Sequence, residues 1–261
     1  MSVIKAKRGL ATTQGWESFL KCYKTSLDYL NKLPRRKYYY LFDPIMQQMN
    51  VVERYLGQLM DRSFNGGINQ LELKDAYRLI IDEILKLQPK LLALWNVQDY
   101  EERTMCIWCD SYNEVINTLS VLANLELTRE DEIYILDRYH AANSSAVNNI
   151  LELQKYAYTK IISATRSFRN SAGSFLIDNI DRAVYLIAKG SFLKPQSRED
   201  YAQRVECYSE ALNLLKQINQ PIIAYFNVMN SSERVMTEWT SLYAASIRTL
   251  KNTISYNKKK A

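Results

Sequence analysis

One pair of cysteines in this chain has the spacing of a metal or redox site. Cys106 and Cys109 are separated by two residues, as in zinc knuckles and thioredoxin-like redox sites. A zinc site needs two more thiolate or imidazole ligands with a recognisable spacing of their own. The chain offers only Cys22, Cys207 and one histidine, His140, each isolated in the sequence. The pair alone is therefore weak evidence for a metal centre.

Catalysis by acids and bases has equally little support. A single histidine removes the Glu-x-x-His pairs of di-iron bundles and most histidine-based arrangements. The acidic runs Asp82–Glu83 and Glu130–Glu132 have no partner motif, and solvated helix faces or helix starts explain them. The sequence has no glycine-rich phosphate loop, nucleophile elbow or zinc signature. We expect a protein that is not an enzyme and that uses no cofactor and no metal.

The elements that would position functional residues occur twice in the chain. The segment ERTMCIWCDSYNEVINTL, which begins at Glu102, matches ERVMTEWTSLYAASIRTL, which begins at Glu233, without a gap. The residue numbers of matching positions differ by the same amount throughout, as Trp108 and Trp239 illustrate. We call this constant difference the repeat offset. The same repeat offset superimposes Leu91–Val97 on Ile222–Val228. We interpret the chain as a tandem duplication.

The second copy also bears on the cysteine pair. Thr237 and Thr240 take the places of Cys106 and Cys109, so the shared fold does not require thiols. We interpret the cysteines as free, reduced thiols of a cytosolic protein.

Composition and periodicity both indicate helices. The chain has 47% hydrophobic and 24% charged residues but only 7 Gly and 5 Pro, which suits long helices joined by short connections. Apolar residues recur at spacings of three and four in both copies, the stripe of an amphipathic helix. We predict an all-α fold of two tandem antiparallel up-down four-helix bundles from an internal duplication. The first bundle covers residues 1–126 with a basic N-terminal arm, and the second covers 127–261 with a basic C-terminal tail.

Local signals place the helix boundaries. Ser197–Asp200, Thr128–Asp131 and Ser231–Arg234 are typical of helix starts, and Pro89 and Pro221 predict kinks or early ends. The fifth helix runs directly from the first copy into the second and would make a rigid connection. The predicted helices cover residues 13–33, 38–63, 69–97, 99–124, 129–166, 171–191, 197–228 and 231–256.

Neither export nor membrane insertion is expected. The opening MSVIKAKR lacks the apolar stretch of a signal peptide, and no run of apolar residues has the length of a membrane span. We expect a cytoplasmic protein.

The charge distribution favours a nucleic-acid partner. The formal net charge is +6 with a sequence pI of about 9.0. Residues 1–126 hold 16 basic and 15 acidic residues, for +1, and residues 127–261 hold 18 and 13, for +5. Clusters of basic residues near aromatic ones can hold a phosphate backbone and stack bases. Solvated basic loops that only aid solubility are the alternative interpretation.

Two basic clusters occupy corresponding places, at the first helix joint of each copy. One precedes the aromatic run Tyr38–Tyr40, and the other precedes Ser174; we align Leu41 with Leu176 and Asp43 with Asp178. A further lysine run is Lys258–Lys260. The candidate nucleic-acid-binding residues at the joints are Lys32, Arg35, Arg36, Lys37, Arg166 and Arg169.

Three features together carry a family resemblance: the opening MSVIKAKR, the KLPRR joint at residues 32–36 followed by aromatics, and the late helix with Glu238–Trp239. With them the chain resembles small bacterial four-helix-bundle proteins, and most of all the accessory variability determinant proteins of diversity-generating retroelements. The resemblance implies a non-enzymatic, positively charged, ring-like homo-oligomer that contacts a reverse transcriptase and binds template RNA. Those proteins usually carry one bundle per chain, whereas this chain has two copies.

The expected function is that of a bacterial or phage retroelement accessory protein. It would bind nucleic acid, RNA in preference, dock on a reverse transcriptase and position the template for copying. The alternative is a helical scaffold that binds protein or forms oligomers without nucleic acid, through exposed aromatics such as Tyr38–Tyr40.

Overall fold

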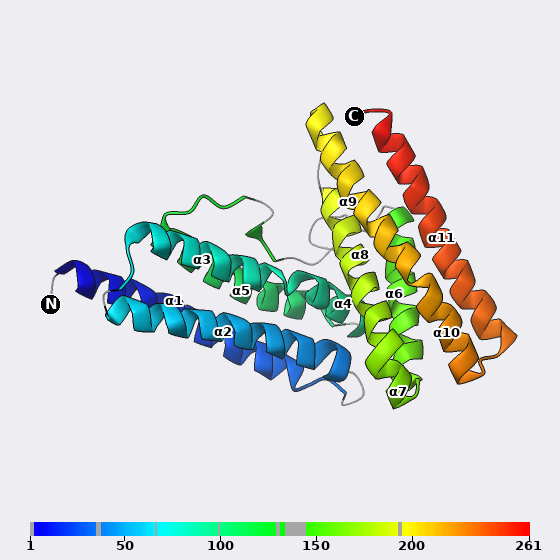
Figure 1. Ribbon diagram of the computed structural model, residues 1–261, viewed down its shortest axis with the longest axis horizontal. Coiled ribbons are helices and arrows are strands. Elements are labelled where there is room, and N and C mark those ends of the chain that lie inside the picture. Colours follow the sequence, from blue (N-terminus) through cyan, green and yellow to red (C-terminus); the bar gives the residue numbers. More distant parts are fainter. Residues whose placement is uncertain are drawn as a thin grey trace. The chain divides into compact units, whose positions relative to one another are not determined.

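The computed structural model of the chain is built from helices (Figure 1). It describes residues 3–34, 38–65, 67–98, 100–128, 131–133, 145–192 and 195–261. All regular secondary structure within these ranges is helical, which confirms the predicted all-α class. None of the described helices combines the length and the hydropathy that a membrane span requires.

The chain divides into two compact units. The first comprises Met1–Lys90 and Glu101–Ile135, and the second comprises Leu91–Tyr100 and Leu136–Ala261. A short segment from the middle of the first copy therefore groups with the second unit. The predicted boundary between residues 126 and 127 stays a prediction about where the two copies meet in the sequence.

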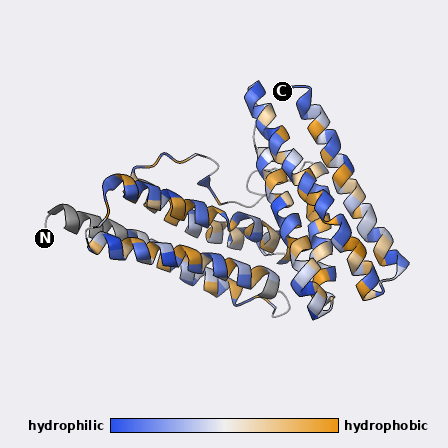
Figure 2. Cartoon of the chain, in the orientation of Figure 1, coloured by the Kyte–Doolittle hydropathy of each residue, from blue (hydrophilic) through white to orange (hydrophobic). Residues whose placement is uncertain are grey.

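The described part of the first unit contains four long helices. Helix α1 packs against α2 and α5, and α3 packs against the same two helices, so that the four surround one core. Hydrophobic residues form stripes along the helices (Figure 2), which provide the buried faces. A short π-helix, η2, leads into α2. The bounds are Val3–Leu30 for α1, Tyr38–Phe42 for η2, Asp43–Phe64 for α2, Gln70–Leu85 for α3 and Glu102–Ala123 for α5.

The second unit repeats this order of contacts. Helix α6 packs against α8 and α11, and α9 packs against the same two. Helix α10 lies on α9, α8 and the π-helix η6, and the segment Leu91–Tyr100, most of it in α4, belongs here too. The bounds are Gln88–Gln98 for α4, Ser145–Ser163 for α6, Arg166–Phe168 for α7, Arg169–Gly173 for η6, Ser174–Phe192 for α8, Arg198–Gln217 for α9, Asn219–Met229 for α10 and Glu233–Lys258 for α11.

The repeat offset relates the first and last residues of several helices as well as the matching residues of the sequence. It converts the bounds of α4 into those of α10, and those of η2 into those of η6. It also relates buried positions in the first two helices of each unit. These pairs are Phe19 and Ile150, Cys22 and Leu153, Leu30 and Ile161, Ile45 and Leu176, Met49 and Ile180, and Leu56 and Ile187.

This register corrects the alignment of Leu41 with Leu176 and of Asp43 with Asp178, which departed from the repeat offset by one helical turn. In the structure Leu176 occupies the position that corresponds to Ile45. The error arose because a shift of one turn keeps apolar residues on the same helix face.

The two prolines begin new helices rather than interrupt old ones. Helix α3 ends at Leu85 and α4 begins at Gln88, so the predicted single helix 69–97 is wrong. The predicted helix 197–228 divides in the same way, into α9 and α10. Pro89 and Pro221 lie in the first turns of α4 and α10, where a missing N–H costs no hydrogen bond. The early ends that the prolines predicted are confirmed.

The predicted continuous helix 129–166 is also wrong, because Glu132 and Ile133 are not helical. Polar side chains of the first unit hold this segment in another conformation. The Asn113 amide donates to the carbonyl oxygen of Ile133 at 2.9 Å and accepts from its N–H at 2.8 Å. Asp131 forms an ion pair of 2.7 Å with Arg78. Residues 134–144, with His140, lie outside the described residues, and α6 is described from Ser145.

The predicted helix starts have mixed outcomes. Ser197 and Asp200 form a capping box at the start of α9, as expected. Ser232 stands at the N-cap of α11, but its side chain makes no capping hydrogen bond. At Thr128–Asp131 the side chain of Asp131 accepts from the N–H of Thr128 at 2.8 Å, which closes a turn instead of opening an α-helix.

Candidate nucleic-acid interface

The basic joint of the second unit places its two arginines differently. Thr165 caps α7, with its hydroxyl accepting from the N–H of Phe168 at 3.4 Å. Arg166 follows and is exposed. Arg169 is half-buried, and its Nη1 donates to the carbonyl oxygen of Ile162 at 3.1 Å. Arg169 thus satisfies a carbonyl at the end of α6, and Arg166 is the better placed of the two for a phosphate.

Four of the six predicted site residues belong to the joint of the first unit. Its residues Arg35, Arg36 and Lys37 lie outside the described residues. Lys32 is exposed, and its Nζ lies 5.2 Å from the centre of the Tyr29 ring. This distance is within the range of a cation–π contact.

The expectation of exposed aromatics at this joint is corrected at one position. Tyr40 is only 3% exposed and belongs to the core of the first unit. The side chains of Tyr38 and Tyr39 lie outside the described residues. The spacing of apolar residues in the sequence could not predict this burial. In a π-helix the angle between successive side chains differs from that in an α-helix.

Each joint is followed by a π-helix, and the sequence pattern predicted neither. Tyr38–Phe42 and Arg169–Gly173 stand at equivalent places, related by the repeat offset. The π-helix is rare in proteins and occurs frequently at functional sites. In the second unit the Ser174 hydroxyl donates to the carbonyl oxygen of Arg169 at 2.9 Å, which satisfies one acceptor of the widened turn.

A second group of basic residues gathers where α11 ends. The Nζ of Lys260 lies 4.6 Å from the centre of the Tyr256 ring and 5.6 Å from that of the Tyr201 ring. Lys258 and Lys259 are exposed beside it in the chain. We name these five residues, Tyr201, Tyr256, Lys258, Lys259 and Lys260, the lysine–tyrosine cluster.

The packing of two helices creates this cluster. Tyr201 stands near the start of α9 and Tyr256 near the end of α11, so the contact with Lys260 requires that the two helices run antiparallel. The capping box of Ser197 and Asp200 fixes the start of α9, with Asp200 accepting from the N–H groups of Gln196 and Ser197 at 2.8 Å each. The sequence pattern revealed the lysines but not the tyrosines, and Tyr256 at four residues before Lys260 was the available signal.

The two tyrosines favour the charged form of Lys260. A hydrogen bond to Tyr256 raises the pKa of the Lys260 ammonium above its usual value, and the neighbouring Tyr201 acts in the same direction. Tyr256 is 56% exposed, so an aromatic face and three ammonium groups are open to a ligand. Protonated lysines beside exposed rings are the groups that bind a phosphate backbone and stack on bases.

The structure does not bring the two described basic groups together. Arg166 lies on α7 at one end of the second unit, and the lysine–tyrosine cluster lies at the other end, near the C-terminus marked in Figure 1. A nucleic acid that contacts both must therefore run along the unit.

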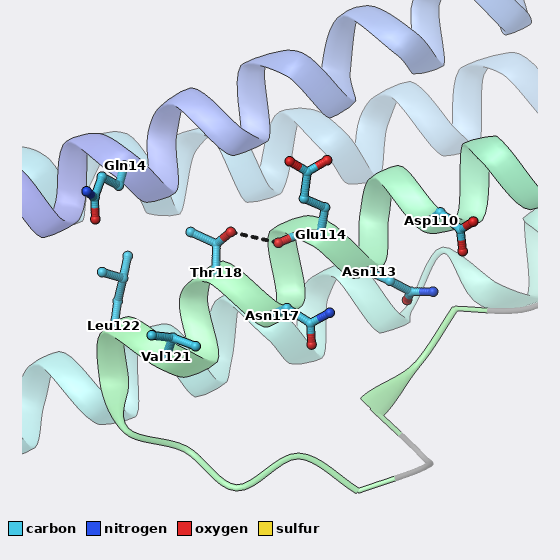
Figure 3. Close-up of a pocket in the computed structure, with 8 residues that line it drawn as sticks. All are labelled: Gln14, Asp110, Asn113, Glu114, Asn117, Thr118, Val121 and Leu122. Atoms are coloured by element: carbon cyan, nitrogen blue, oxygen red, sulfur yellow. Dashed lines mark hydrogen bonds between the residues drawn. The ribbon is translucent and has the colours of Figure 1, made fainter.

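A shallow hollow on α5 of the first unit has a different character (Figure 3). It presents two carboxylates, Asp110 and Glu114, and side-chain amides. Glu114 already forms an ion pair of 3.1 Å with Lys21, and its carbonyl oxygen accepts from the Thr118 hydroxyl at 2.8 Å. The negative charge makes the hollow unsuitable for phosphate.

The cysteine pair does not build a metal site in the part of the chain that is described. Cys109 is buried and Cys106 half-buried, and neither forms a disulfide. Within the described ranges, no group of three or more His, Cys, Asp or Glu side chains is placed to hold a metal ion.

Comparison with known proteins identifies no relative: no family model, no curated protein and no solved structure matches this chain.

Proposed function

We propose that this protein binds nucleic acid without catalysing a reaction, and that it is built from two tandem four-helix bundles of a duplicated sequence. The single observation that carries the binding proposal is Lys260, placed against the rings of Tyr201 and Tyr256 beside Lys258 and Lys259. The exposed Arg166 and the net charge of +5 on residues 127–261 support it.

The duplication proposal rests on one alignment of the two halves of the chain, in which every position pairs at the same repeat offset. The repeat offset relates sequence matches, element bounds and buried positions at once. In each half, four helices contact one another in the same cyclic order. Two units of this size are each long enough to bury a core of their own.

The dimensions of the second unit suit a nucleic-acid helix. Helix α11 has 26 residues, and a rise of 1.5 Å per residue makes it about 39 Å long. Duplex DNA rises 3.4 Å per base pair, so the length of α11 corresponds to about eleven base pairs. A strand that follows the unit could therefore engage both basic groups.

The proposed biological setting rests on the family resemblance. In that setting the chain is an accessory protein of a bacterial or phage retroelement, prefers RNA, and holds the template on a reverse transcriptase. It would act in the cytoplasm and by positioning, not by chemistry. Copurification of the chain with a reverse transcriptase encoded beside it would support this setting, and failure of the two purified proteins to bind each other would remove it.

The binding proposal is tested by fluorescence anisotropy with labelled structured RNA and duplex DNA. Binding through phosphates should weaken by at least tenfold between about 50 mM and about 200 mM salt. Replacing Lys258, Lys259 and Lys260 with alanine should weaken it further and reduce the salt dependence. Each lost phosphate contact lowers the slope of log affinity against log salt by about 0.7 to 0.9.

Two further variants separate the candidate surfaces. The joint variant changes Lys32, Arg35, Arg36, Lys37 and Arg166 to alanine but keeps Arg169, because Arg169 holds the end of α6. The charge control changes three exposed basic residues of the first unit, Lys24, Lys74 and Arg103, to alanine. Equal loss of affinity in the control and the lysine variant would reduce the proposal to nonspecific charge, and absence of wild-type binding would reject it.

The alternative function is a protein-binding or self-assembling scaffold. One observation favours it: Ile223 and Val228 of α10 are 44% and 56% exposed. Large aliphatic side chains that stay exposed on one helix are typical of an interface. A scaffold of this kind would show no salt-sensitive binding to the labelled RNA or DNA, and the same titration therefore separates the two functions.

A further inference from the structure

Two corresponding segments of the chain differ in the exposure of one side. LLALWNV in α4 corresponds to IIAYFNV in α10 at the repeat offset. In α4, Leu92 is 0% and Val97 8% exposed, whereas their counterparts Ile223 and Val228 are 44% and 56% exposed. The side chains at these positions are similar in the two helices, and only the packing of other residues against them differs.

The hydrogen bonds of Asn96 show which way the covered face of α4 points. Asn96 lies four residues after Leu92 and three after Ala93, and Val97 lies four after Ala93, so the four residues fall on one side of the helix. Asn96 shows where this side points, because its Nδ2 donates to the carbonyl oxygen of Leu151 in α6 at 2.9 Å. The apolar face therefore points toward α6 within the second unit.

A polar network in α6 and α8 receives Asn96. Its Nδ2 also donates to Oε1 of Gln154 at 2.8 Å. Gln154 is fully buried, and its Nε2 donates to Asp181 at 2.9 Å. Tyr158 donates to the other oxygen of the same carboxylate at 2.8 Å. Asn96 thus fits a receptor whose polar groups are fixed in advance.

The first unit has the corresponding receptor on α1. The counterpart of Leu151 is Leu20, which is 44% exposed. The counterparts of Gln154 and Asp181 are Tyr23 and Asn50, and they too are hydrogen-bonded, with the Tyr23 hydroxyl donating to Asn50 at 3.2 Å. The receptor on α1 thus retains the polar pair and leaves its leucine uncovered.

We propose that α10 of one molecule docks on α1 of a second copy of this chain, in the manner in which α4 docks on α6. Ile223, Ala224 and Val228 cover Leu20 and its apolar neighbours. The amide of Asn227, exposed in the single chain, donates to the main-chain carbonyl oxygen of Leu20 and to the hydroxyl oxygen of Tyr23. Helix α10 is the chosen occupant because it matches the α4 face in residue character at all four positions.

The contact joins unlike surfaces, so it repeats. Each molecule presents an α10 face and an α1 receptor, and such a heterologous contact produces a closed ring or an open filament. This inference is independent of nucleic-acid binding, because none of its residues belongs to the lysine–tyrosine cluster or to the basic joints.

Sedimentation velocity without nucleic acid tests the proposal with three single variants. Ile223→Glu removes the α10 face, and Leu20→Glu removes the α1 receptor. Both positions are exposed, so neither change should unfold the protein. Leu71→Glu is the matched control, since Leu71 is 69% exposed and lies in the first turn of α3, on neither surface. The wild type and the control should form assemblies larger than a monomer, and the other two variants should sediment as monomers.

Mixing the two monomeric variants is the decisive step. The Ile223→Glu protein keeps its α1 receptor and the Leu20→Glu protein keeps its α10 face, so an equimolar mixture should form a dimer and nothing larger. A wild type that is monomeric at its highest soluble concentration overturns the proposal. So does a mixture that stays monomeric, because the α10 face and the α1 receptor would then not bind each other. A Leu20→Glu variant that still self-associates also overturns it, because its contact would not use α1.

Discussion

The indole N–H of Trp108 donates a hydrogen bond of 2.8 Å to the Ser26 hydroxyl in the core of the first unit. The same hydroxyl lies 2.8 Å from Tyr112 Oη. At the equivalent positions of the second unit stand Trp239 and Ala157, and the buried Trp239 Nε1 has no hydrogen-bond partner among the described residues. Both cores bury an indole at this position, and the free-energy cost of burying it is higher in the second unit, where its N–H is not hydrogen-bonded.

Ser26→Ala should destabilise the protein by about 1–3 kcal/mol, because it leaves the buried indole N–H of Trp108 without an acceptor. Urea unfolding followed by circular dichroism measures the loss. The reciprocal change, Ala157→Ser, should be neutral or stabilising by up to about 1 kcal/mol, since a hydroxyl there could accept from Trp239. A Ser26→Ala protein as stable as the wild type would show that the hydrogen bond contributes nothing.

Asp131→Asn should destabilise the first unit at neutral pH and not in acid. Burial alone would raise the pKa of the Asp131 carboxyl, but hydrogen bonds from Arg78 and Thr128 outweigh it, and the pKa falls below its ordinary value of 3.8. A lowered pKa in the folded state stabilises the protein above the unfolded-state pKa, and this contribution disappears as the pH falls through the folded-state pKa.

Solvent limits how much the ion pair of Asp131 with Arg78 contributes to the free energy of unfolding. The Arg78 side chain is 41% exposed, and screening reduces the contribution to about 1–2 kcal/mol. Urea unfolding of both proteins at about pH 7 and about pH 3 measures it. The difference should shrink at the lower pH, and a difference that grows there would contradict the sign of the shift.

Gly190→Ala should destabilise the second unit by about 1–3 kcal/mol. A Cβ at this position would lie 2.7 Å from Cε1 of the Tyr208 ring, which packs against α8 at that point. The matched control is Gly57→Ala in α2, where a Cβ meets no atom of the described residues within 4 Å. This control should stabilise by about 0.5–1 kcal/mol through helix propensity alone. Thermal unfolding of both variants compares them, and opposite shifts are the expected result.

Thiol labelling should distinguish the cysteines. Burial raises the pKa of the Cys22 thiol to about 12, so its reactive thiolate is scarce at mildly alkaline pH. Cys106 is the only half-exposed cysteine, and the other three are buried. Mass spectrometry after brief alkylation of the native protein should find Cys106 modified first and Cys22 last. Early modification of Cys22 would show that α1 opens readily from the core.

The sequence by itself determined the helical class and the repeat. The spacing of Met105, Trp108, Tyr112 and Leu119 predicted one buried face of a helix, and all four residues are buried. Such inferences succeed because the period of a helix and an ungapped offset are local properties of the chain. The prolines predicted kinks or early ends, and the helices before α4 and α10 do end close to them, but the pattern did not reveal that new helices begin there.

Only the tertiary structure decided which surfaces are free. Arg166 and Arg169 look alike in sequence, yet one is exposed and the other holds the end of α6. Tyr201 and Lys260 are far apart in the chain, and the antiparallel packing of α9 and α11 brings them together. The faces of α4 and α10 are nearly identical, and one is covered while the other is open. Exposure and long-range contact depend on what packs against a residue, and the local pattern around that residue does not contain this information.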